Sequence, residues 1–103
     1  MPRYLFVYHG GGRPETEEAQ QKVMAAWGAW MEGLGAALVD GGAPVGMSVT
    51  VGPGGVADNG GANPASGYSM VEAESQAAAA EMARGCPILA DGGSVEVAEI
   101  MAM

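Results

Sequence analysis

The sequence predicts an α+β protein in which one antiparallel β-sheet is covered on one face by two helices. Short segments that alternate at the strand period of two recur along the chain. Two segments with helical spacing lie between them, and each ends at a glycine. Along the chain the order is strand, helix, strand, strand, strand or loop, helix, strand. This order favours an α+β sandwich.

The first strand is expected at Arg3–Tyr8, a run of β-branched and aromatic residues. Both of its faces are apolar: Tyr4, Phe6 and Tyr8 point one way, and Leu5 and Val7 the other. Both faces of this strand therefore need cover. His9 and the three glycines after it end the strand.

A long helix should begin at Pro14, whose fixed φ suits a first helical turn, and it should end at Gly35. Acidic residues just after Pro14 favour a helix N-terminus because they complement the helix dipole. Trp27 and Trp30 fall on the apolar stripe of this helix. We expect both rings in the core rather than in a ligand-stacking pair.

Two short strands are expected next, at Ala36–Val39 and Ser48–Val51, with the first ended by Asp40-Gly41-Gly42. Residues Gly52–Pro64 are almost entirely Gly, Pro, Ala, Asn and Asp. Such a segment cannot build a core, and ordering it has a high entropy cost. It is expected to be a long mobile loop.

The segment Ser66–Gly85 predicts a strand followed by a helix. Tyr68, Met70 and Glu72 alternate with Ser69, Val71 and Ala73. Ser75 then opens an alanine-rich helix that should close at Gly85, just before Cys86-Pro87. A last alternating strand is expected at Ser94–Met101.

This order of elements predicts a ferredoxin-like sandwich with both helices on one face of the sheet. We expect Leu5, Val7, Val71, Val95 and Val97 to meet the helices. The opposite face would then carry Tyr4, Phe6, Tyr8, Tyr68 and Met70. So much exposed apolar surface is unusual for a soluble monomer, so we expect a homodimer closed sheet to sheet.

Composition limits the partners. The 103 residues suit a single domain, residues 1–103, and the formal net charge of -8 repels phosphate backbones and anionic membranes. We expect neither nucleic acid nor membrane as a partner. The single cysteine cannot form an intramolecular disulfide, and the short apolar opening lacks the features of a signal peptide. We therefore expect a cytoplasmic protein.

An ordered set of segments resembles the YCII-related proteins, and within them the branch named for an Asp-Gly-Pro-Phe loop. These segments are YLFVYHG, AWMEGLGAALVDGG, GYSMVEAES, Cys86-Pro87 and GSVEVAEI. The resemblance implies a ferredoxin-like fold that pairs into a dimeric α/β barrel. It also implies an activity that is mostly undefined, although the wider family includes a muconolactone dehydrochlorinase.

Some members of that family are thought to use a histidine of the first helix with an aspartate just before the proline that follows the second helix. Here the first helix has no histidine, and Cys86 precedes Pro87. The Asp-Gly-Pro-Phe loop is replaced by Asp58-Asn59-Gly60-Gly61 and the residues after it. That acid/base pair is therefore not expected in this chain.

His9 is the only histidine, and it lies where the first strand ends, at a cleft mouth in this architecture. It could transfer protons with a carboxylate such as Asp91 or Glu72 as its partner, or it could simply be a polar surface residue. Cys86 is a poor candidate nucleophile because a helix C-terminus raises the pKa of a thiol.

Glu72 and Glu96 interrupt predicted strands on the face opposite the helices. With Tyr8 and Tyr68 they could form the polar end of a ligand pocket, or they could be edge charges that prevent aggregation. No recognised metal-ligand spacing occurs, so we expect no metal and no cofactor. Two functions stay open: binding of a small organic molecule in the cleft of the dimer, or a cofactor-free lyase or isomerase that uses His9 and a cleft carboxylate.

Overall fold

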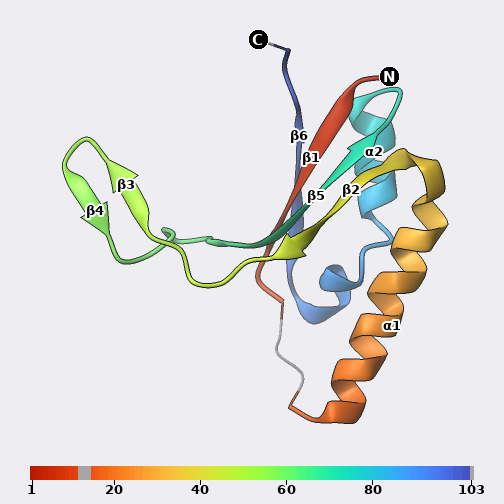
Figure 1. The fold of residues 1–103 in the computed structure, drawn as a ribbon, viewed down its shortest axis with the longest axis horizontal. Coiled ribbons are helices and arrows are strands. Elements are labelled where there is room, and N and C mark those ends of the chain that lie inside the picture. The colour runs from red at the N-terminus through yellow and green to blue at the C-terminus, as the bar shows by residue number, and fades with distance from the viewer. Residues whose placement is uncertain (12–14, 103) are drawn as a thin grey trace.

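The structure of the chain is a computed structural model that describes residues 1–11 and 15–102. Its main sheet has the strand order β2-β5-β1-β6, and each neighbouring pair is antiparallel. Helices α1 and α2 both cover one face of this sheet (Figure 1). The predicted ferredoxin-like architecture is thereby confirmed. The elements are β1 (Arg3–His9), α1 (Glu17–Leu34), β2 (Leu38–Pro44), β3 (Thr50–Gly52), β4 (Gly55–Ala57), β5 (Ala65–Glu72), α2 (Gln76–Ala83) and β6 (Ser94–Glu99), with short 3₁₀ helices η1 (Gly35–Ala37) and η2 (Pro87–Asp91).

Helix α1 begins later than predicted because Thr16 supplies its N-cap. The Thr16 hydroxyl accepts a hydrogen bond from the backbone N–H of Ala19 at 3.0 Å. Glu17 and Glu18 then occupy the first turn. The predicted start, Pro14, lies outside the described residues. The predicted end is correct, because Gly35 follows the last helical residue with a positive φ of 57°.

The strand after α1 was placed wrongly. Residues 35–37 form η1, and β2 runs through Asp40-Gly41-Gly42 instead of ending there. The strand continues because it bulges: its register on β5 shifts on both sides of Asp40. Gly42 has a φ of 67°, and a Cβ at this position would collide with the carbonyl oxygen of Tyr68. Only glycine permits this close approach of β2 to β5.

Residues expected to form a mobile loop contain a strand. Within the predicted loop Gly52–Pro64, β4 pairs with β3 as an antiparallel hairpin. The Thr50 hydroxyl donates a hydrogen bond to the carbonyl oxygen of Asn59 at 2.6 Å, which closes the base of the hairpin. This hairpin projects away from the sheet and both helices (Figure 1). The hairpin is held by backbone hydrogen bonds between its two strands, which form without a hydrophobic core in this segment.

Helix α2 follows the prediction at its start and departs from it at its end. The Ser75 hydroxyl accepts from the N–H of Ala78 at 3.1 Å, as an N-cap should. The C-cap is Arg84 rather than Gly85. Gly85 serves packing instead, because a Cβ there would lie 3.1 Å from the Trp30 ring. Strand β6 ends at Glu99, before the predicted Met101.

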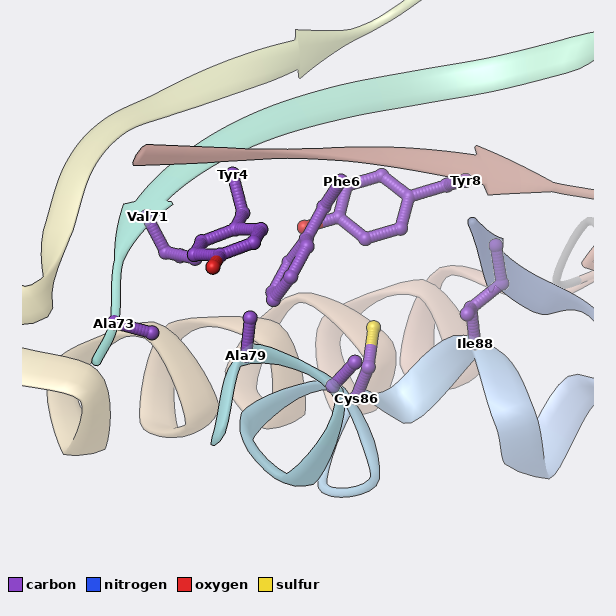
Figure 2. Close-up of a cluster of buried hydrophobic side chains, with 9 residues drawn as sticks. Tyr4, Phe6, Tyr8, Val71, Ala73, Ala79, Cys86 and Ile88 are labelled. Carbon is purple, nitrogen blue, oxygen red and sulfur yellow. The ribbon is translucent and has the colours of Figure 1, made fainter. Parts of the chain in front are cut away.

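The faces of β1 are the reverse of those predicted. Tyr4, Phe6 and Tyr8 are buried against the helices, while Leu5 and Val7 lie on the opposite face. Figure 2 shows the three rings on the side of β1 that faces α2 and η2. The small side chains of Ala79 and Ala83 on α2 leave room for them.

Strand pairing gives the physical reason for this reversal. Directly opposed residues of an antiparallel pair share a face, and Tyr4 is opposite Val71 while Phe6 is opposite Val97. Val71, Val95 and Val97 do pack on the core, as predicted. Aromatic residues of β1 must therefore lie with these valines. The periodicity of β1 alone could not decide this, because both of its faces are apolar.

We call the face turned away from the helices the outer face. Its centre consists of Leu5 and Val7 of β1 with Tyr68 and Met70 of β5, which pair in register. An ion pair between Arg3 and Glu72, with Nε and Oε1 3.5 Å apart, lies at one end. The pair formed by His9 and Glu96 lies at the other. The outer face is thus an apolar strip between two polar pairs.

Candidate functional site

His9 and Glu96 form a close pair on the outer face. The distance from His9 Nε2 to Glu96 Oε1 is 2.9 Å, and His9 Nδ1 lies 3.3 Å from the carbonyl oxygen of Pro64. Both partners are hydrogen-bond acceptors, so only the imidazolium form donates to both at once. The ring is buried, with 8% of the residue exposed, whereas the Glu96 side chain is largely exposed. The arrangement resembles an acid/base pair, and it equally resembles a structural contact that holds β1 and β6 together.

The other proposed partners of His9 lie elsewhere. Asp91 is an exposed residue of η2 on the helix side of the sheet. Glu72 is engaged by Arg3 at the far end of the outer face. Across residues 1–11 and 15–102, the partners of the His9 ring are Glu96 and Pro64. The structure therefore joins His9 to Glu96 rather than to Asp91 or Glu72.

A cavity of about 780 Å³ opens on the helix side, between α1 and the ends of the central strands. This volume lies within the range of small-molecule sites. Its walls are mainly apolar and come from α1, β1, β2, β5 and η2. The lining residues are Tyr8, Gly10, Gly11, Met24, Trp27, Met31, Gly41, Gly42, Ala43, Pro44, Val45, Ser66, Gly67, Tyr68, Ile88 and Asp91. We call this space the helix-side cavity.

The bulge of β2 shapes one wall of the helix-side cavity. The N–H of Gly42 donates to Asp40 Oδ1 at 2.9 Å, which turns the backbone at this point. Behind it, the Tyr8 hydroxyl donates to Ser69 Oγ at 2.7 Å, and Ser69 donates to the Gly41 carbonyl oxygen at 2.7 Å. This chain of hydrogen bonds ties the floor of the cavity to its wall.

Of the residues proposed from sequence, Tyr8, Tyr68 and Asp91 line this cavity, whereas His9, Glu72 and Glu96 do not. Tyr68 also belongs to the outer face, where it is opposite Val7. Sequence reasoning missed the cavity itself. A signal was present: Met24, Trp27 and Met31 recur at the spacing of one helical face, and small residues of β2 and β5 leave space opposite them. Without the strand order, nothing showed that these segments face each other.

Aromatic rings form the interior end of the cavity. Tyr8 and Trp27 meet edge to face, with ring centroids 4.9 Å apart, and Trp30 stands edge to face with Trp27 at 5.7 Å. Trp30 Nε1 donates to the carbonyl oxygen of Met82 at 3.0 Å and so links α1 to α2. Both tryptophans are half-buried and pack on the core, as the apolar stripe indicated.

Two buried groups have raised pKa values. Burial is the main cause that raises the pKa of Tyr8 to about 12; the hydrogen bond to Ser69 opposes the rise, and nearby Cys86 adds to it. Burial also raises the pKa of the Cys86 thiol, partly offset by a backbone hydrogen bond involving Ile88. Cys86 is therefore a core residue and a weak nucleophile. Tyr8 remains a neutral donor across the physiological range.

The raised pKa of Tyr8 predicts alkaline destabilisation. The unfolded chain releases this proton near pH 10.0, and the folded chain near 12, so the folded state holds more protons between these values. Stability should therefore fall as pH rises from about 10 to about 12. Urea unfolding of wild type and Tyr8→Phe tests this. At pH 9 the substitution should lower the free energy of unfolding by about 1 kcal/mol, because a hydrogen bond is lost. At pH 11.5 this difference between wild type and variant should be smaller. An equal difference at both pH values would contradict the raised pKa of Tyr8.

Comparison with known proteins identifies the family. The model of the YCII-related domain matches residues 4–103, nearly the whole chain. This chain belongs to the YCII-related domain family. No curated protein matches it, and no solved structure does. The ferredoxin-like fold described above is the fold of this YCII-related domain.

The described part of the YCII-related domain has neither a membrane-spanning helix nor a metal-binding cluster. Within residues 1–11 and 15–102, no helix is both long and apolar enough to cross a membrane. In the same part of the chain, no three His, Cys, Asp or Glu side chains gather closely enough to hold a metal ion.

Proposed function

We propose that this YCII-related domain is a homodimer, closed outer face to outer face, and that it binds a small organic molecule. The observation that carries ligand binding is the helix-side cavity, which combines sufficient volume, aromatic walls and few polar groups. The resemblance of the sequence to the Asp-Gly-Pro-Phe branch supports the dimer. The proposed ligand site is thus the helix-side cavity and not the cleft between the two sheets of the dimer.

The shape of the chain supports pairing. Its accessible surface is 6912 Å², against about 5,400 Å² for a compact monomer of 10.3 kDa. Its radius of gyration is 14.8 Å, against roughly 13 Å for a compact domain of this length. The β3–β4 hairpin, where Val51 and Val56 are exposed, contributes to this excess. On the outer face Tyr68 is exposed, and Leu5, Val7 and Met70 are partly exposed. A second copy that covers the strip would remove such surface from water.

The proposal has two separate tests. Sedimentation at micromolar concentration should give twice the 10.3 kDa mass of the chain; a persistent monomer would refute the dimer and leave ligand binding open. A thermal-shift screen of small organic molecules should find ligands, since a ligand at a hundred times its Kd adds about 2.7 kcal/mol of stability. Trp27→Ala should abolish those shifts, because Trp27 lines the cavity. Shifts that survive this substitution would locate the ligand elsewhere.

A second function is favoured by the His9–Glu96 pair: a cofactor-free lyase or isomerase. A histidine hydrogen-bonded to a carboxylate can take up and return a proton during an elimination or isomerisation. On this proposal, Glu96 is the cleft carboxylate that orients His9. Turnover of a substrate, once found, should fall at least about a hundredfold in His9→Gln. An undiminished rate would show that the His9–Glu96 pair has only a structural role.

A further inference from the structure

The described lining of the helix-side cavity carries charge of one sign. Among the lining residues that the structure describes, Asp91 is the charged side chain, and it is exposed. No described lysine or arginine belongs to the lining. The chain as a whole has a formal net charge of -8, which adds a negative field around the opening. An anionic ligand would meet repulsion here, whereas a cation would be attracted.

The aromatic wall suits a cation as well. Tyr8 and Trp27 stand at an interplanar angle of 83°. Trp27 is half-buried and lines the cavity, and the faces of aromatic rings attract ammonium groups. Met24 and Met31 on the same helix add flexible, polarisable surface that adapts to an apolar ligand body. The walls thus combine apolar contact with recognition of positive charge.

One polar atom of the lining lacks a partner. Ser66 Oγ is buried and forms no hydrogen bond within the described part of the chain. A buried hydroxyl without a partner is costly, and most such groups in proteins are satisfied. Ser66 lines the cavity, so a ligand N–H could donate to this oxygen. Together with Asp91, it gives an amine two acceptors.

We propose that the helix-side cavity binds a primary amine in its ammonium form, carried on an aromatic or aliphatic body. This inference rests on the proposed function, because it assigns a ligand class to the same cavity. The ammonium group pairs with the Asp91 carboxylate and donates to Ser66 Oγ. The apolar body lies against Trp27 and the methionines of α1.

Three probes of similar size and different charge test the inference: phenethylamine, phenethyl alcohol and hydrocinnamate. Isothermal calorimetry on the full chain should show the amine binding about tenfold more tightly than the alcohol, and no binding of the acid. Asp91→Asn should weaken the amine about three- to tenfold and leave the alcohol unchanged. Asp58→Asn, an equal charge change at an exposed residue outside the cavity, should alter neither.

Different results would contradict the amine class and the ligand site itself. Equal binding of amine and alcohol, or an amine affinity that Asp91→Asn does not change, would overturn the amine class and leave the cavity as a ligand site. Tighter binding of the acid would do the same. If none of the probes binds and the wider thermal-shift screen is also blank, the proposed function and the ligand class fail together.

Discussion

Replacing Phe6 by alanine will lower the free energy of unfolding by about 3 to 5 kcal/mol, because the ring is fully enclosed and its removal leaves a cavity. Phe6 has no exposed surface and stacks on Trp30 with ring centroids 6.3 Å apart. A domain of this size has a total stability of about 5 to 15 kcal/mol. The variant should therefore be close to unfolded. Urea unfolding followed by tryptophan fluorescence measures the loss.

Leu5→Ala is the matched control for Phe6→Ala, since Leu5 is the neighbouring residue on the outer face and is only partly buried. Its cost should be clearly smaller at the same protein concentration. Phe6→Leu, which keeps most of the volume, should cost less than about 1.5 kcal/mol. If Leu5→Ala proved the more damaging change, the assignment of the two faces of β1 would be wrong.

Replacing Val7 by lysine will weaken the proposed dimer by about a hundredfold or more. Val7 lies at the centre of the outer face, opposite Tyr68 on one side and Glu96 on the other. Burying an ammonium in a dry interface costs several kcal/mol, and 1.4 kcal/mol is a tenfold change in Kd. In a two-fold dimer each subunit brings the substitution, so the cost is incurred twice. Sedimentation equilibrium should show mainly monomer.

The Val7→Lys monomer should remain folded, because Glu96 lies directly across the strand pair and offers the new ammonium an opposite charge. Ala25→Lys is the matched control. It adds the same charge at an exposed position of α1, on the side of the sheet away from the outer face, and should leave the dimer intact. A Val7→Lys protein that still sediments as a dimer would show that the subunits pair through another surface.

Much of the fold followed from local sequence signals. The Ser75 cap, the positive φ after α1 and the alternation of β5 each depend on a few neighbouring residues, and each lies where it was expected. The paths of β2 and of the β3–β4 hairpin could not be predicted from such local signals. Glycines there indicated a break, but in the structure they permit a bulge and a tight hairpin.

The candidate site was harder to predict than the fold. His9, Tyr8, Tyr68 and Asp91 were all predicted as candidate site residues from their residue types and positions. The sequence did not show which of these residues meet in space. His9 and Tyr8 are adjacent in sequence, yet they point to opposite faces of β1. Glu96 is the partner of His9 because β6 pairs with β1, a contact between residues far apart in the chain.

By itself, the sequence determined the two helices, the strands β1, β5 and β6, and the acidic and apolar character of the chain. These properties depend on local composition and period, while an ordered set of segments carried the resemblance to the family. Only the tertiary structure decided which face of β1 enters the core, which carboxylate meets His9 and where a cavity remains. The physical reason is that both faces of β1 are apolar, so strand pairing with Val71 and Val97 has to choose between them. That choice places Tyr8 beside Trp27 in the helix-side cavity.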